Sequence, residues 1–173
     1  DQLDMAGIEA VLTSHPSGLR LLASADAPMD AVRAGVTLNR LRTMCDVCLL
    51  DLGAGASELT LALASRSNVL ILALDSDRET LAQASRVIGD LREAASPWPV
   101  LKLLHINRAG TPDDAAQATI QTALGNKPVT VIGPALDAAQ PASGGGQPLV
   151  ISQPDHPVAV QLRALAESLI RAE

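Results

Sequence analysis

Short aliphatic runs alternate with longer amphipathic stretches along this sequence, and this alternation limits the fold more than any other feature. Short apolar runs predict buried strands, whereas stretches with an apolar residue at every third or fourth position predict helices. Strands separated by helices predict right-handed βαβ units, in which helices cover both faces of a parallel sheet. We therefore expect an α/β fold with a mostly parallel sheet.

The pattern also gives boundaries, and we expect one domain over residues 1–173. The predicted strands span Leu19–Ser24, Val47–Leu52, Asn68–Leu74, Val100–Asn107 and Val129–Gly133. The predicted helices span Leu3–Leu12, Pro28–Met44, Ser57–Ala64, Ser76–Ala94, Thr111–Gly125 and Val158–Glu173. Residues 138–157 are rich in Gly and Pro, which predicts an irregular connection before the last helix, and this helix is expected to pack on the sheet.

Composition excludes some classes of function. The sequence has no Phe, no Tyr and a single Trp, while 47% of its residues are hydrophobic. The core must therefore be aliphatic, and the aromatic platforms on which single-stranded nucleic acids stack are missing. The net charge of −6 argues against a sequence-independent grip on phosphate backbones. We expect no strong binding of nucleic acid.

The apolar segments are too short to cross a membrane, and no basic region precedes a short apolar core at the N-terminus. We therefore expect a cytoplasmic protein. Cys45 and Cys48 have the C-x-x-C spacing of a redox pair or half a zinc site, but no second pair completes four zinc ligands. We interpret them as small, buried apolar residues in the reducing cytosol.

Asp51 is the first candidate for a functional residue. It ends a predicted buried strand directly before a loop that contains Gly53 and Gly55. In an open parallel sheet, ligands bind at the carboxyl ends of the strands, so Asp51 is expected to hold a ligand. The glycines would let the backbone approach a phosphate closely. The alternative is that Asp51 only caps the loop that follows.

Other strand ends carry polar residues as well. Asn107 ends a predicted strand, and its amide could recognise the edge of a base or simply occupy a turn. Asp75 and Asp77 follow another strand, and we interpret them as caps of the next helix, where Ser76 and Glu79 also have capping-box spacing. The three histidines have no metal-ligand spacing, so none receives a catalytic role.

The sequence contains, in this order, the stretches DVCLLDLGAG, NVLILALDSDRETLAQASRVIGDLRE, LHINRAG and IGPALDAAQ followed by GQPLVISQPDHPVAVQLRALAESL. Together they resemble the later two-thirds of the ParA/MinD family of P-loop ATPases, which has a SIMIBI-like P-loop NTPase fold. Near the N-terminus, VLTSHPSGLRLLASADAPMDA resembles the CpaE/TadZ branch of that family.

The resemblance implies a role for several residues. Asp51 would hold Mg²⁺ through water, with Gly53 and Gly55 near the γ-phosphate of ATP. Asn107 and Arg108 would contact the adenine. Residues 134–137 would form the other wall of the base pocket, chiefly through Pro134 and Asp137. The implied cofactors are ATP or ADP with Mg²⁺, and the implied assembly is a homodimer.

One element of the family is missing from this sequence. The motif G-x-x-x-x-G-K-[ST], whose backbone amides and lysine cradle the phosphates, does not occur. The N-terminal βαβ portion of the family fold would lie upstream of Asp1, and we expect a longer natural protein because residue 1 is not Met. This chain alone is expected to be inactive, whereas the complete protein would be an ATPase.

Three classes of function remain open. The first is a nucleotide-switched positioning or partitioning protein. Its partners would belong to a Tad-type pilus or to another cellular machinery that such a protein positions. The second is a non-enzymatic scaffold that has lost the P-loop. The third is a receiver-like domain that accepts a phosphoryl group on Asp51, although Lys102 lies at the start of its strand and not at the end that such domains need.

Overall fold

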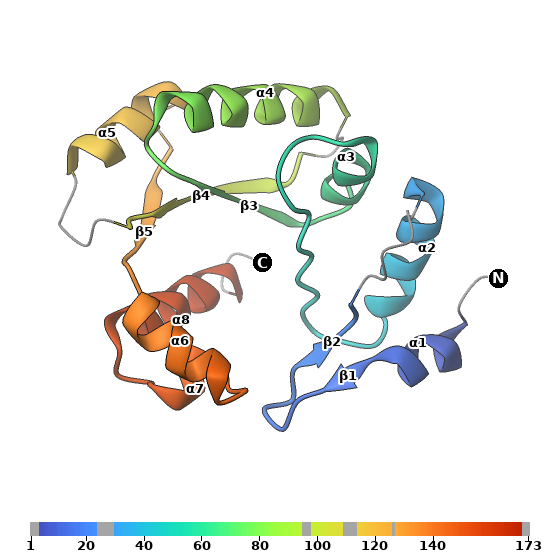
Figure 1. The fold of residues 1–173 in the computed structure, drawn as a ribbon. Coiled ribbons are helices and arrows are strands. Elements are labelled where there is room, and N and C mark those ends of the chain that lie inside the picture. The colour runs from blue at the N-terminus through green and yellow to red at the C-terminus, as the bar shows by residue number, and fades with distance from the viewer. Residues whose placement is uncertain (1–3, 24–29, 95–97, 109–113, 126, 171–173) are drawn as a thin grey trace.

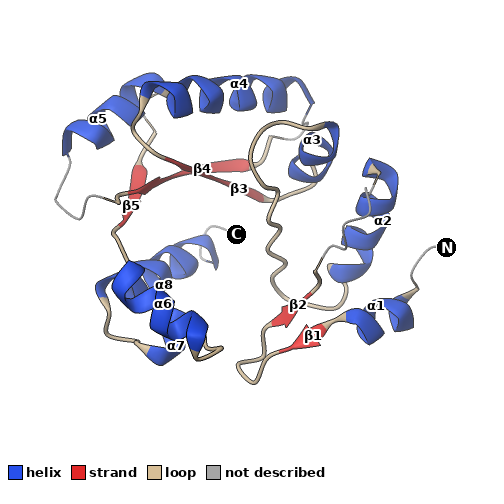
Figure 2. Ribbon diagram, in the orientation of Figure 1, coloured by secondary structure: helices blue, strands red, loops and turns tan. Residues whose placement is uncertain are grey.

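The computed structural model describes residues 4–23, 30–94, 98–108, 114–125 and 127–170, and Figures 1 and 2 show their arrangement. The N-terminal elements are α1 (Met5–Val11), β1 (Thr13–Ser14), β2 (Arg20–Leu21), α2 (Ala31–Leu41) and α3 (Glu58–Ala64). The central elements are β3 (Val69–Leu74), α4 (Arg78–Ala94), β4 (Val100–Ile106), α5 (Asp114–Ala123) and β5 (Val129–Ile132). The C-terminal helices are α6 (Leu136–Gly144), α7 (Leu149–Ser152) and α8 (Pro157–Ile170).

The main sheet has the order β3-β4-β5, and both pairs are parallel. Val69 lies opposite Val100, and Leu103 lies opposite Val129, so the strands are aligned over most of their length. In Figure 1, α4 and α5 lie on one side of this sheet and α6 and α8 on the other. The expected α/β fold, a parallel sheet with helices on both faces, is confirmed.

The core lies between the sheet and the layer formed by α4 and α5. Alternate residues of a strand face opposite sides of a sheet, and those on one side of β3 and β4 pack against the helices. The buried members of this cluster are Leu74, Leu81, Ala84, Ile88, Leu101, Leu103, Ile120 and Leu124. Every one is aliphatic, as the composition requires, and Trp98 packs at the margin of the cluster.

On the opposite face of the sheet, α8 contacts β5. Val158 and Ala159 in the first turn of α8 are buried, whereas Ile170 at its end is exposed. The Gln161 side chain also accepts a hydrogen bond of 2.9 Å from the backbone N–H of Gly133, directly after β5. The expected packing of the last helix on the sheet is therefore confirmed at β5.

The N-terminal part holds a short antiparallel hairpin and three helices that begin at side-chain caps. β1 pairs with β2, and the side chains of Asp4, Asp30 and Ser57 accept hydrogen bonds from the first turns of α1, α2 and α3. Such caps satisfy backbone N–H groups that the first turn of a helix leaves unpaired. In the described part of the chain, no helix is long and apolar enough to cross a membrane.

The strand predicted over Val47–Leu52 is wrong. The structure has extended, non-strand backbone there, and Val47 and Leu49 have exposed fractions of 71% and 85%. The composition suits a strand, but a strand needs a neighbour to satisfy its backbone N–H and C=O groups. The structure pairs this segment with none of the described strands. The strand predicted over Leu19–Ser24 is shorter than expected, since β2 contains only Arg20 and Leu21.

The irregular connection predicted over residues 138–157 is also largely wrong. Helices α6 and α7 occupy much of it, and α6 tolerates Pro141 in its interior. Ala138 and Ala142, one turn apart, are both buried, so packing outweighs the poor helix propensity of Pro and Gly.

The start of α4 also differs from the prediction. The capping box at Ser76 is replaced by a cap at Asp77, which accepts hydrogen bonds from the N–H groups of Glu79 and Thr80.

Some predicted boundaries lie outside the described residues. They are the helix starts at Leu3, Pro28 and Thr111, the strand end at Ser24, and the last three residues of the final helix.

Candidate functional site

Asp51 lies in the extended segment that leads from α2 to α3. Its Oδ1 accepts a hydrogen bond of 3.0 Å from the N–H of Gly53, which closes a tight turn. Gly53 and Gly55 have φ angles of 66° and 92°, a conformation that L side chains rarely adopt. This loop therefore requires its glycines for backbone reasons, and Asp51 caps it locally, as in the simpler of the two interpretations above.

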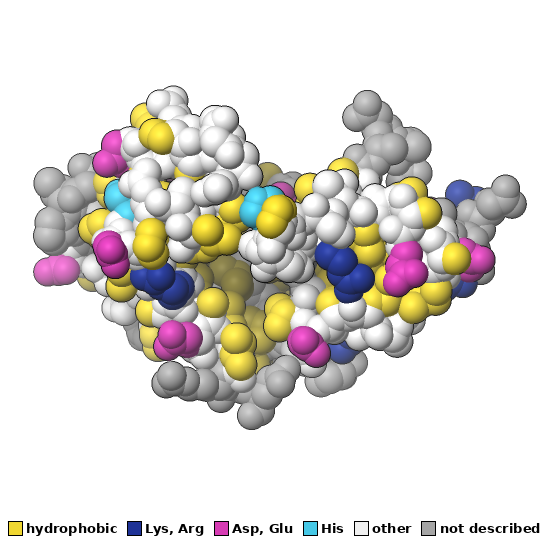
Figure 3. Space-filling view, turned by 90° about the horizontal axis from the view of Figure 1, so that it is seen from below, with side chains coloured by type: hydrophobic (Ala, Val, Ile, Leu, Met, Phe, Trp, Pro, Cys, Tyr) yellow, Lys and Arg dark blue, Asp and Glu magenta, His cyan; other side chains and the backbone are white. Residues whose placement is uncertain are grey.

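A groove of about 940 Å³ separates this segment from the main sheet. One wall consists of residues 45–55, the other consists of β3 and the α4 residues behind it, and Leu169 and Ile170 of α8 border it. Viewed from below in Figure 3, the molecule has a central hollow lined by hydrophobic side chains. Asp51, Gly53 and Gly55 share this groove with Leu74, the last residue of β3.

The residues predicted to bind adenine lie at the carboxyl ends of β4 and β5. Asn107 is 8% exposed, and its backbone N–H donates a hydrogen bond of 2.8 Å to the carbonyl of Ile132. Because Ile106 pairs with Ile132, Asn107 and Arg108 leave β4 where Pro134 leaves β5. Asp137 follows in the first turn of α6.

These residues form two groups in the structure. The carboxyl-end group contains Asn107, Arg108, Pro134 and Asp137, whereas the groove is lined by Asp51 and the two glycines and by none of the four. Arg108, Pro134 and Asp137 are exposed at this edge of the sheet, whereas Asn107 beside them is buried.

The carboxyl edge also contains polar groups that sequence reasoning did not select. The His105 side chain is 4% exposed, and its Nε2 lies 3.9 Å from Asp75 Oδ1, which is too long for a hydrogen bond. Its Nδ1 is buried without a hydrogen-bond partner. Gln161 is the other missed residue, because nothing in a helical pattern reveals that its amide caps the end of β5.

Both cysteines line the groove. The Cys45 thiol is exposed and donates to the carbonyl of Leu41, whereas Cys48 is half-buried and both thiols are free. Burial raises the pKa of Cys48, and the neighbouring Cys45 raises it further. A high pKa keeps the Cys48 thiol protonated and unreactive, which agrees with a structural role for Cys48. The expected burial is wrong for Cys45, which is exposed.

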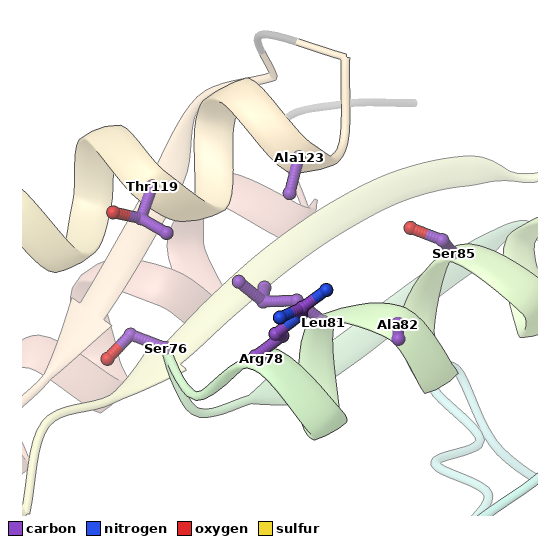
Figure 4. A pocket seen from close by; sticks show the side chains of 7 residues that line it. All are labelled: Ser76, Arg78, Leu81, Ala82, Ser85, Thr119 and Ala123. Atoms are coloured by element: carbon purple, nitrogen blue, oxygen red, sulfur yellow. The ribbon is translucent and has the colours of Figure 1, made fainter.

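A second, smaller hollow of about 340 Å³ lies between α4 and α5 on the outer layer. Figure 4 shows the side chains that line it, among them Arg78, Ser85 and Thr119. The lining comes from α4, α5 and Ser76 in the loop before α4, and it combines one cation with hydroxyls and apolar groups. It lies apart from the strand ends that hold the candidate residues.

The chain supplies only part of what a magnesium nucleotide needs. Magnesium is usually held by one or two carboxylates together with phosphate oxygens and water, and Asp51 offers one carboxylate. Within the described ranges, no group of three or more His, Cys, Asp or Glu side chains could hold a metal ion. The sequence also lacks a phosphate-cradling loop. By themselves, the residues present do not fit a magnesium nucleotide.

Comparison with known proteins bears on the fold. No protein-family model matches the sequence. A search of curated proteins found no match either. Among solved structures, the crystal structure of a ParA family ATPase from Chlorobium tepidum TLS superimposes with a TM-score of 0.82 and 18% sequence identity, covering 96% of this chain and 71% of that one. At this identity the likeness establishes the fold, and the chain has the α/β fold of a ParA-like P-loop NTPase.

Proposed function

We propose that this chain forms the switch and base-binding part of a nucleotide-switched positioning protein of the ParA/MinD type. The observation that carries the proposal is the ParA-like fold, which extends over 96% of the chain. In the complete protein, ATP with Mg²⁺ would hold two subunits together as a homodimer, and hydrolysis would release them.

The proposed roles follow the positions of the side chains. Asp51 would hold Mg²⁺ through water, and the loop with Gly53 and Gly55 would face the γ-phosphate, since left-handed glycines present backbone N–H groups without a side chain in the way. Asn107 and Arg108 would contact adenine, with Pro134 and Asp137 as the opposite wall. Support for this second group is that register brings the ends of β4 and β5 together.

The finer assignment concerns the process that the protein serves. The segment from Val11 to Ala31 resembles the CpaE/TadZ branch, and on this basis we propose partners in Tad-type pilus assembly or in another positioned machinery of the cytoplasm. Co-purification with pilus assembly proteins in a pilus-forming host would support this branch. Association with a chromosome-partitioning complex instead would support another branch of the same family.

The first experiment is to measure the intact mass of the natural gene product and compare it with 17.9 kDa. A larger product with an upstream G-K-[ST] loop would supply the cradle that this sequence lacks. A product of the same mass would favour the scaffold alternative, to which the local Asp51–Gly53 turn already gives support.

Asp51→Ala tests the site itself. In the complete protein, we expect this change to abolish Mg²⁺-dependent ATP turnover and to leave the fold intact, because Asp51 is exposed and its one hydrogen bond lies within a loop. Asp46→Ala is the matched control, since Asp46 is an exposed acid on the same groove wall. Unchanged turnover in the Asp51 variant, measured by phosphate release, would remove Asp51 from the site.

A further inference from the structure

The connection between β5 and α6 has few means of fixing its own conformation. It consists of Gly133, Pro134 and Ala135. Glycine has no side chain, and proline has no backbone N–H to donate. Ala135 is the N-cap of α6 and makes no side-chain capping hydrogen bond, at a position that Ser, Thr, Asp or Asn usually occupies. The conformation of this connection therefore depends on contacts from other parts of the chain.

The first of these contacts is made where the sheet ends. The N–H of Asn107 donates to the carbonyl of Ile132, which directs the backbone of Ile132 toward β4. Backbone groups of successive strand residues point to opposite sides, so the N–H of Gly133 points to the outer edge of β5. Among the described strands, β5 pairs with β4 alone. The Gln161 side chain accepts this N–H at 2.9 Å, and so satisfies a donor that no neighbouring strand reaches.

Two further contacts reach α6 from the chain just before α8. Gln153 Nε2 donates a hydrogen bond of 3.5 Å to the carbonyl of Ala138. His156 Nε2 lies 3.8 Å from Asp137 Oδ1. The His156 ring is itself held, because its Nδ1 accepts a hydrogen bond from the first turn of α8. Contacts from the C-terminal part of the chain therefore flank residues 134–137 at both ends, and Figure 1 shows α8 beside the passage from β5 to α6.

We infer that Gln161 is a positioning residue for the base site of the proposed function, on which this inference rests. Its amide oxygen fixes the turn at Gly133, and this turn sets where Pro134 and Asp137 lie relative to Asn107. Gln161 acts through the backbone and does not touch the nucleotide. A binding site works when its walls are held within about 0.5 Å of their productive geometry. Loss of the acceptor is therefore expected to weaken recognition of the base.

A purely structural role for Gln161 predicts something different. In that case, its loss would lower the stability of the chain and weaken every ligand of the complete protein by the same factor. A positioning role predicts that only the contribution of the base is lost. The fold is expected to survive, because Val158 and Ala159 are buried and keep the start of α8 packed at β5.

The first experiment uses the 173-residue chain without nucleotide. Gln161→Leu has a similar size but no acceptor, whereas Gln161→Glu keeps an acceptor oxygen. We expect amide hydrogen exchange of Gly133, measured by NMR, to quicken about fivefold or more in the Leu variant and to stay unchanged in the Glu variant. The amide of Asn107, which is bonded within the sheet, should exchange at the same rate in both. Unchanged exchange of Gly133 in the Leu variant would overturn the inference.

The second experiment measures binding to the complete protein by calorimetry. The two ligands are ATP and tripolyphosphate, each with Mg²⁺, and tripolyphosphate has the phosphates of ATP without its ribose and base. We expect Gln161→Leu to lower the affinity for ATP about fivefold, to leave tripolyphosphate binding unchanged, and to be rescued by Gln161→Glu. Gln121→Leu is the matched control, since Gln121 is a half-buried glutamine on α5, on the other face of the sheet.

The outcomes separate this inference from the function on which it rests. If the natural complete protein binds ATP no better than tripolyphosphate, the base site fails, and the role of Gln161 fails with it. If the natural protein prefers ATP and Gln161→Leu weakens both ligands equally, Gln161 is only structural and the proposed function still stands. Equal losses in the Gln161→Leu and Gln121→Leu variants would overturn the inference in the same way.

Discussion

At the scale of single residues, Asp77 shows how one side chain fixes the start of a long helix. Its Oδ1 accepts hydrogen bonds from the N–H groups of Thr80 and Glu79, at 2.9 and 3.0 Å. The interaction with Thr80, first through its side chain and then through its backbone, lowers the pKa of Asp77 below the ordinary value of 3.8. The ionised form therefore stabilises the fold.

The lowered pKa gives a pH dependence with a defined sign. The contribution of Asp77 is fully present above pH 3.8 and is lost as the pH falls through its lower folded-state pKa. Asp77→Asn should keep the cap at neutral pH but lose less free energy of unfolding on acidification than the natural chain. Urea melts at pH 7 and at acid pH check this, with Asp90→Asn on the exposed face of α4 as control. Identical acid sensitivity in both variants would contradict it.

At the scale of elements, β3 has one satisfied and one unsatisfied edge. In the chain alone, we expect amide hydrogen exchange to alternate along this strand, slow at Leu70, Leu72 and Leu74 and fast at Val69, Ile71 and Ala73. The reason is that only the first set donates within the sheet. Exchange measured by NMR would contradict the open edge if all six amides were equally protected.

Helix α4 contains a glycine whose replacement should stabilise the protein. Gly89 has helical backbone, and a Cβ there would meet nothing within 4 Å. Gly89→Ala should raise the free energy of unfolding by about 0.5–1 kcal/mol, because glycine loses more backbone freedom on folding. Gly35→Ala in α2 is the contrast, since its Cβ would lie 2.7 Å from Arg66 Nη1, so the Arg66 side chain must move and the gain in stability should be smaller. If chemical denaturation shows the same gain in free energy of unfolding for both variants, the space around the added Cβ does not decide the effect.

The elements that sequence reasoning located well are those whose partners are near in the chain. β3, β4 and β5 are joined by α4 and α5, so the alternation of apolar runs predicts both the strands and their packing. Residues 47–52 have the same composition but no neighbouring strand, and composition alone cannot reveal that. α6 was missed because the burial of Ala138 and Ala142 depends on tertiary contacts that outweigh Pro141.

The candidate site residues also differ in how well the sequence predicts their positions. Strand-end reasoning placed Asn107, Arg108 and Pro134 at one edge of the sheet, because β4 and β5 are predictable neighbours. The turn that Asp51 closes with Gly53 agrees with the alternative that Asp51 caps its loop. The sequence could not reveal that Asp51 lines a groove, because the groove depends on the missing strand pairing. Their roles toward a nucleotide stay predictions.

At the scale of the whole molecule, the most deeply buried part of the sheet should dominate stability. Leu103 is 1% exposed at the centre of the middle strand. Leu103→Ala should lower the free energy of unfolding by about 2–5 kcal/mol through lost burial and a cavity. Leu49→Ala removes the same atoms from an exposed position and should change stability little in the chain alone. If both substitutions lower the free energy of unfolding equally in urea denaturation, Leu49 is buried in solution and the groove is closed.

The core cluster lies between Leu70 and Val129, within one uninterrupted stretch of sequence. Contacts between residues close along the chain cost less entropy to form than contacts between distant ones, so units with many of them fold quickly. The three strands and two helices of this stretch are therefore expected to collapse first during refolding. The hairpin and the glycine-bearing segment would join afterwards, and they should be the first parts that a protease removes from the native protein.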